Sequence, residues 1–171
     1  MKPSLLGLAL AALLATPAAA KPLDVVASIS VIGDIVAEVG GPEVAVMTLV
    51  PAEADAHDFE PTPQDAKAIA KADLVVVNGL GLEGWLERLI AASGYKKTVA
   101  VASAGISPRE MTEHGETETD PHAWNDAANG ARYARTVAAA LAKADPPHAE
   151  AYAARGEAYA KKLLDLDAWA K

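Results

Sequence analysis

Short apolar runs alternate along this chain with longer segments in which apolar positions recur every three or four residues. The short runs are rich in β-branched residues, which is typical of strands buried on both faces of a sheet. They predict four strands, at residues 23–30, 43–50, 73–78 and 98–103.

The segments between these strands have helical periodicity and recognisable ends. Ser30 is expected to cap a helix over 31–39, and Thr62 begins the next helix with a capping-box pattern. Residues 82–93 predict a third helix with one apolar stripe. Because such alternation favours right-handed βαβ units, the expected fold class is α/β, with a four-stranded parallel sheet flanked by helices.

The second half of the chain has a different pattern. Residues 104–126 show no strong period and are expected to form a long loop, which in a compact domain is usually functional. A helix is predicted over 127–143, and a last helix follows as a rod of about 37 Å. That length indicates a strut to a further part. The expected organisation is a lobe at 21–143 and a long linker helix at 144–171.

Residues 1–20 have the three-part pattern of a signal peptide. Lys2 supplies the positive charge, residues 5–15 the apolar core, and Ala18-Ala19-Ala20 the small residues for cleavage. The apolar core is shorter than the ~20 residues that span a bilayer, so we expect export without stable membrane insertion. The sequence has no cysteine, so we expect no lipid-bearing cysteine at the cleavage site and a mature protein free in a periplasm.

Composition excludes some classes of binding partner and limits which side chains could bind a metal ion. The net charge of −8 and the pI near 4.9 argue against nucleic acid and against an anionic membrane surface. Without cysteine, any metal ion must be bound by histidine and carboxylate side chains.

Two histidines lie in similar loops, each flanked by aspartate and proline. His57 follows the second predicted strand, and His122 lies in the loop after the fourth. Ligands of open parallel sheets bind at the carboxyl ends of the strands, so both imidazoles are expected at one edge. Two neutral imidazoles with carboxylates nearby suit a divalent transition metal. A single loop histidine is more often only solvated; the pairing is what favours a metal site.

Three further side chains are candidates to support that site. Glu60 and Asp120 could accept the second ring N–H of the imidazoles, the alternative being loop solvation or helix capping. His114 lies among glutamates in the long loop and is a candidate for auxiliary metal scavenging. Its alternative is a solvated residue on a surface loop.

Residues 79–84 read Gly-Leu-Gly-Leu-Glu-Gly, a literal match to the dinucleotide pattern G-x-G-x-x-G. A dinucleotide site also needs an acidic residue about 20 positions further on, where this chain has Ser103-Ala104-Gly105. We therefore favour a tight turn between a strand and a helix.

Four segments carry a resemblance to a known family: VVASISVIGDIVAEVGG, HDFEPTPQDAKAIAKADLVVVNGLGLEGWL, DPHAWNDAANGARYA and EAYAARGEAYAKKLLDLD. They resemble the metal-specific substrate-binding proteins of ABC importers, the zinc or manganese class also called metal-binding lipoproteins or adhesins. The chain departs from the family pattern at Asn125 and Ala127, where an apolar residue and a proline are common, and it lacks a long histidine-rich loop.

The resemblance implies two lobes, each a four-stranded parallel sheet, joined by one rigid helix with the metal ion between them. It assigns His57 and His122 as the ligands of the first lobe, and a histidine and an acidic residue as those of the second. The last helix matches the linker. The resemblance therefore implies a first lobe with its linker helix, with the second lobe absent from this sequence.

The expected function is capture of Zn²⁺ or Mn²⁺ in the periplasm. The ion is expected to be delivered to the permease of an ABC importer in the inner membrane. The protein is expected to be a monomer and not an enzyme. Protonated imidazole cannot ligate, so binding should weaken as the pH falls through about 6.5, the ordinary pKa of histidine. One alternative is a periplasmic metallohydrolase with Glu60 or Asp58 as general base. Another is an adhesion or interaction module.

Overall fold

The computed structural model describes residues 21–113 and 116–171, so the predicted signal peptide and His114 lie outside the described residues. Its centre is a parallel sheet of four strands in the order β2-β1-β3-β4. The strands are β1 (Leu23–Ile29), β2 (Val44–Val50), β3 (Leu74–Val77) and β4 (Val99–Val101). The predicted fold class is confirmed.

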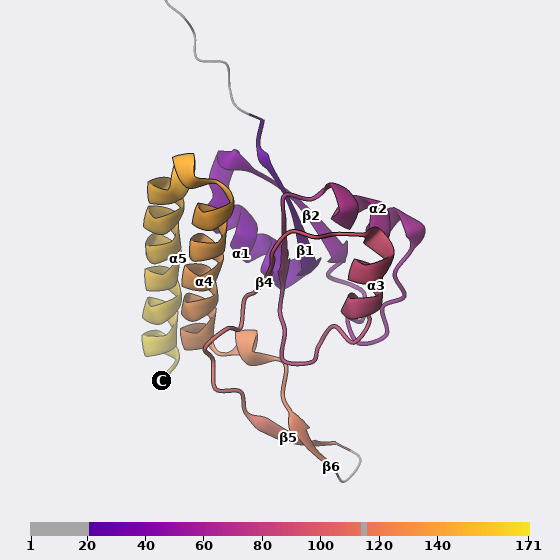
Figure 1. Ribbon diagram of the computed structural model, residues 1–171. Helices are drawn as coiled ribbons and strands as arrows, with labels where there is room; N and C mark the ends of the chain where they lie inside the picture. Colours follow the sequence, from indigo (N-terminus) through magenta and orange to yellow (C-terminus); the bar gives the residue numbers. More distant parts are fainter. Residues whose placement is uncertain (1–20, 114–115) are drawn as a thin grey trace, which may run out of the picture.

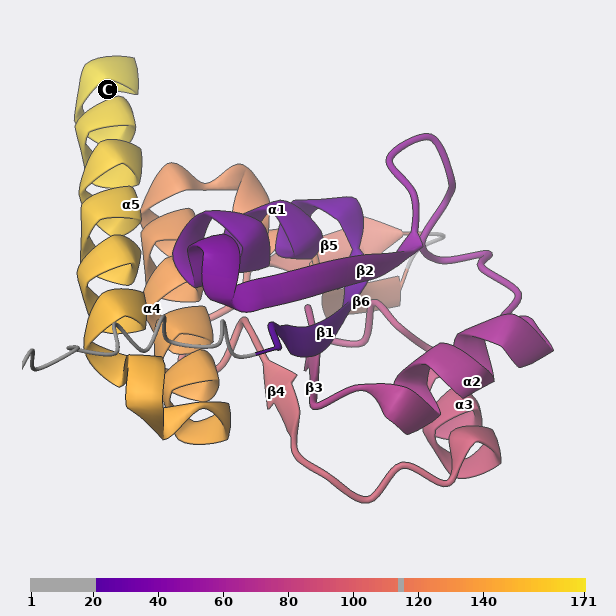
Figure 2. The same ribbon diagram turned by 90° about the horizontal axis from the view of Figure 1, so that it is seen from above.

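Helices cover both faces of the sheet (Figures 1 and 2). One face carries α1 (Ser30–Gly40), α4 (Ala127–Ala144) and α5 (Ala149–Ala170). The other face carries α2 (Pro63–Lys71) and α3 (Leu86–Ser93). Three short 3₁₀ turns complete the helical elements: η1 (Gly41–Glu43), η2 (Ala123–Asn125) and η3 (Pro146–His148). In the part of the chain that the structure describes, no helix has the length and apolar character needed to cross a membrane.

The central strand β3 shows why this sequence forms a buried sheet. All four of its residues, Leu74–Val77, are buried, because helices pack on both sides of it. Helix α2 starts where the sequence predicts, since Thr62 accepts a hydrogen bond from the backbone N–H of Asp65, and Asp65 accepts one in return. The capping box fixes where the loop after β2 ends.

Helix α5 packs against α4 and α1 on the side away from the sheet (Figures 1 and 2). The two helices approach closely at Gly156, where an added Cβ would lie 2.7 Å from the Cβ of Ala138. Tyr152 is fully buried, whereas Trp169 near the other end of the helix is 82% exposed. The division into a lobe at 21–143 and a linker at 144–171 stays a prediction.

Three predicted details differ from the structure. Ser30 is the first residue of α1 and not its cap, because β1 runs directly into the helix and Ile29 takes the cap position. The helix predicted over 82–93 begins only at Leu86, because the preceding residues form a turn. The predicted loop 104–126 contains an antiparallel hairpin of β5 (Glu110–Glu113) and β6 (Glu116–Thr119); since β6 is exposed throughout, it leaves no apolar alternation in the sequence.

The strand order reverses between β1 and β3. The chain moves outward from β1 to β2 on one side, and from β3 to β4 on the other. A crevice outside the carboxyl ends of the strands at such a reversal is the usual ligand position in open α/β sheets.

Candidate functional site

The structure brings His57 and His122 together at the carboxyl edge of the sheet. Their Nε2 atoms lie 3.4 Å apart, and their ring centroids are 5.4 Å apart. Two nitrogens bound to one tetrahedral zinc ion at about 2.05 Å would be separated by about 3.3 Å. The spacing of the two ring nitrogens therefore fits a single ion between them.

Both histidines line one cavity of about 260 Å³ at the reversal of strand order. The ends of β1 and β2 form part of its wall, through Ile29 and Val50, and Leu82 and Trp124 contribute apolar surface. The ring of Trp124 packs edge-on against that of His122, with centroids 5.1 Å apart. An ion in this cavity would have imidazole nitrogens on one side and an apolar wall behind them.

Asp120 holds the His122 ring from behind. Its Oδ1 accepts the backbone N–H of His122 at 2.9 Å and lies 2.8 Å from Nδ1 of the same ring. These two hydrogen bonds lower the pKa of Asp120 below its ordinary value, and the bond from the backbone N–H contributes more than the bond from the ring. With Nδ1–H donating to the carboxylate, Nε2 presents a lone pair to the cavity, as a metal-binding imidazole requires.

The His57 loop is held by its backbone. Asp55 Oδ1 accepts the backbone N–H of His57 at 2.8 Å, and Trp85 Nε1 donates to the carbonyl of Ala56 at 2.9 Å. Glu60 is exposed, and among the described residues the structure shows no hydrogen bond from it to either imidazole. The supporting role of Glu60 stays a prediction.

Two imidazoles leave coordination positions of a bound ion open, since zinc takes about four ligands. Within residues 21–113 and 116–171 there is no group of three or more histidine, cysteine, aspartate or glutamate side chains arranged to hold a metal. The donor set of the described chain is therefore the histidine pair, with Asp120 behind it. It suits reversible contact with a cation more than a closed structural site.

The β3–α3 loop contributes three residues that the sequence analysis did not identify: Asn78, Glu83 and Trp85. Asn78 Nδ2 donates to the carbonyl of Pro121 at 3.0 Å, next to His122. Glu83 accepts the backbone N–H groups of Asn78 and Gly79 at 2.6 and 3.0 Å. A polar residue at the end of an apolar strand and an acidic residue inside a glycine run were the available signals.

The same contacts decide how the glycine-rich pattern is used. Gly79, Leu80 and Gly81 have φ values of 84°, 57° and 87°, the left-handed region that glycine favours. An added Cβ at Gly79 would lie 2.5 Å from a methyl group of Val101. Glu83 already occupies the first backbone N–H groups of the turn, so they are not free to hold a phosphate.

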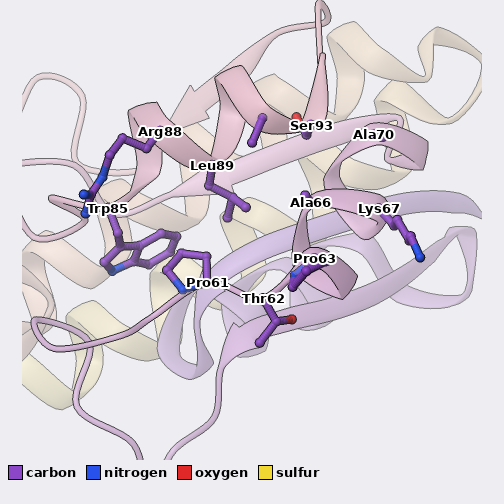
Figure 3. Close-up of a pocket in the computed structure, with 11 residues that line it drawn as sticks. Pro61, Thr62, Pro63, Ala66, Lys67, Ala70, Trp85, Arg88, Leu89 and Ser93 are labelled. Atoms are coloured by element: carbon purple, nitrogen blue, oxygen red, sulfur yellow. The ribbon is translucent and has the colours of Figure 1, made fainter.

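A second hollow, of about 640 Å³, lies between α2 and α3 (Figure 3). Pro61, Ala66, Trp85 and Leu89 line it, and neither histidine does. Trp85 contributes to both regions. Its ring lines the hollow, and its Nε1 donates a hydrogen bond to the carbonyl of Ala56 in the loop that carries His57.

Comparison with known proteins gives a consistent result. The family described as ZnuA, zinc-uptake complex component A periplasmic, matches residues 25–171. The manganese-binding lipoprotein MntA of Halalkalibacterium halodurans is 36% identical over 148 residues, which are 86% of this chain and 48% of that protein. The iron-binding protein YfeA of Yersinia pestis is 35% identical over 150 residues, 87% of this chain and 48% of that protein.

A Mn-bound periplasmic metal-binding protein from Candidatus Liberibacter asiaticus has a similar structure, with a TM-score of 0.74 and 34% identity. The match covers 82% of this chain and 52% of that one. The chain thus spans about half the length of the relatives it matches. Because the family match extends over the sheet, both histidine loops and the last helix, this chain belongs to the ZnuA family of periplasmic zinc-uptake components.

Proposed function

We propose that this chain captures a divalent transition metal ion, Zn²⁺ or Mn²⁺, as part of a substrate-binding protein that delivers the ion to the permease of an ABC importer. One observation carries the proposal. The Nε2 atoms of His57 and His122 lie 3.4 Å apart at the strand-order reversal, and Oδ1 of Asp120 lies 2.8 Å from Nδ1 of the His122 ring.

The chemistry of the pair supports binding and release. Neutral imidazoles bind zinc and related ions, and an ion held by two of them exchanges ligands more readily than one in a closed site. In the proposed two-lobed protein, residues 21–143 form the first lobe and residues 144–171 the linker helix. The remaining ligands then come from a second lobe that closes over the ion.

The names of the relatives support a metal ion as the cargo. Those quoted above are named for manganese and iron, and the matched structure contains manganese. In the proposal the protein acts as a monomer in the periplasm, after removal of residues 1–20. It binds its cargo without chemical conversion, as expected for a family of substrate-binding proteins.

The test is metal titration in competition with a chromophoric chelator, with Zn²⁺ and Mn²⁺ as probes. We expect His57→Ala and His122→Ala each to weaken binding of the preferred ion by about 100-fold, because each removes one of two direct ligands. His148→Ala is the matched control, since His148 bonds to Asp145 and lies outside the cavity that holds the pair. Equal binding by the parent and all three variants would contradict the proposal.

A further inference from the structure

A cluster of polar side chains lies next to the His122 loop, inside a core that is mostly apolar. It consists of Ser28, Asn78, Glu83, Ser103 and Tyr133, all of them buried. They come from β1, the end of β3, the β3–α3 loop, the segment after β4, and α4. No buried side-chain nitrogen or oxygen in the described part of the chain lacks a hydrogen-bond partner, so the cluster is fully satisfied.

Asn78 is the centre of this cluster, with an exposed fraction of 0%. The hydroxyl of Tyr133 donates to its Oδ1 at 2.7 Å. Burial raises the pKa of Tyr133 to about 12, so this hydroxyl keeps its proton at neutral pH and can donate. The other end of the amide, Nδ2, therefore faces the two carbonyls that need a donor, those of Gly79 at 2.9 Å and Pro121 at 3.0 Å.

The bond to Pro121 acts on the peptide unit that leads into His122. The carbonyl of that unit accepts from Asn78, and its N–H donates to Asp120 at 2.9 Å. Both polar groups of one planar peptide are thus held from different sides. Because the plane ends at the Cα of His122, these two bonds set the direction from which the imidazole leaves the backbone.

Glu83 holds Asn78 in turn. Its Oε1 accepts the backbone N–H of Asn78 and the hydroxyl of Ser28, both at 2.6 Å, and its Oε2 accepts the N–H of Gly79 at 3.0 Å. Ser103 Oγ donates to the carbonyl of Asn78 at 2.6 Å. Every polar group of Asn78, on backbone and side chain, therefore has a partner, and the amide has no alternative orientation that satisfies its neighbours.

We propose that Asn78 is a positioning residue for His122 in metal capture, with Glu83 and Tyr133 fixing its amide. This inference rests on the proposed function. The described chain supplies only two direct ligands, so any freedom of the His122 loop that is lost on binding reduces the affinity. A loop fixed in advance by Asn78 has already lost that freedom.

A purely structural role for Asn78 would give a different result. Loss of a buried amide destabilises the fold wherever it lies, since its former partners are left unpaired. Loss of a positioning contact also weakens metal binding, and does so only while the positioned ligand is present. A double-mutant cycle with His122 separates the two roles.

The experiment is a zinc titration, in competition with a chelator, of the full chain and of Asn78→Ala, His122→Ala and the double variant. We expect Asn78→Ala to weaken zinc binding about 10-fold in the parent, the lower end of the effect of contacts that orient a metal ligand. In the His122→Ala background we expect a change below about twofold, because no positioned ligand remains. Thermal unfolding of each variant establishes that it is folded.

Two further variants keep the test decisive. Val36→Ala removes buried side-chain volume from α1, outside this cluster, and is the stability-matched control, expected to leave zinc binding unchanged. Tyr133→Phe removes only the hydroxyl that orients the amide; it replaces Asn78→Ala if that variant does not fold, with an expected loss of about threefold that again depends on His122.

The outcomes distinguish the two proposals. If zinc binding by the parent does not depend on either histidine, the proposed function fails. If binding depends on both histidines but Asn78→Ala and Tyr133→Phe bind like the parent, only the positioning role fails. An equal loss in the parent and in the His122→Ala background would also overturn it, because the effect would then be a general one on the fold.

Discussion

The loops that carry His122 and His57 reach the same edge of the sheet but are anchored differently. Around His122, Asp120 binds both the backbone and the ring, Asn78 binds the preceding carbonyl, and Asp126 caps the helix that follows. Around His57, apart from the Nε2 contact with His122, the hydrogen bonds among the described residues involve the loop backbone: the N–H of His57 donates to Asp55, and the indole of Trp85 donates to the carbonyl of Ala56. One imidazole is therefore preorganised, and the other lies on a more exposed loop that can adjust to an ion.

The difference shows how a site can combine one fixed metal ligand with one adjustable ligand. A fixed ligand lowers the entropy lost on binding, and an adjustable ligand allows the ion to enter and leave. The pH dependence of binding tests whether both imidazoles take part, and single substitutions test whether their supports are unequal.

The largest expected effect comes from acidification. Protonated imidazole cannot bind the ion, so once acidification has protonated both histidines of the metal-free protein we expect the zinc affinity of the parent to fall about 100-fold per pH unit, because each imidazole must lose a proton to bind. The backbone N–H of His122 and, to a lesser extent, its ring N–H donate hydrogen bonds that lower the pKa of Asp120, so this carboxylate stays ionised during the acidification and adds no third proton.

Zinc titrations between pH 7.5 and 5.5 measure this slope. In His57→Ala the slope should fall to about tenfold per unit, since one imidazole remains. A parent slope of only tenfold would show that a single histidine binds the ion.

The next effect concerns the two aspartates. Asp120→Ala should weaken zinc binding about 10-fold, because the His122 ring loses the partner that fixes its orientation. Asp55→Ala removes a backbone contact only and should cost less than about threefold. Calorimetric or competition titrations of both variants measure the ratio, and equal losses would contradict the unequal anchoring.

The smallest effect is expected at Trp85. Trp85→Phe keeps an aromatic ring beside Phe59, whose ring centroid lies 4.9 Å away, but removes the donor to Ala56. A neutral hydrogen bond contributes about 1 kcal/mol to stability, and this one lies at the residue before His57, so we expect at most about a twofold loss of zinc affinity and a similarly small loss of stability. Leu89→Ala is the control for packing alone, because Leu89 lines the same hollow between α2 and α3. It should destabilise the fold and leave zinc affinity unchanged.

Much of the fold could be predicted because its signals are local. The four apolar runs became the four strands, and Thr62 with Asp65 marked the start of α2. The hairpin of β5 and β6 could not be predicted, since its exposed strand has no apolar face. Ser30 was assigned as a cap from residue type alone, whereas the strand pairing of Ile29 with Val50 decides where β1 ends and α1 begins.

The sequence by itself determined a parallel α/β fold with histidines after its second and fourth strands, because periodicity and residue type are read over a few positions. Only the tertiary structure decided that the two Nε2 atoms lie 3.4 Å apart and that Asn78, Glu83 and Trp85 support their loops. The hydrogen bond from Asn78 joins residues 43 positions apart, and that from Ser28 to Glu83 joins residues 55 apart. Contacts over such separations depend on how the strands are ordered and packed, and they leave no local pattern in the chain.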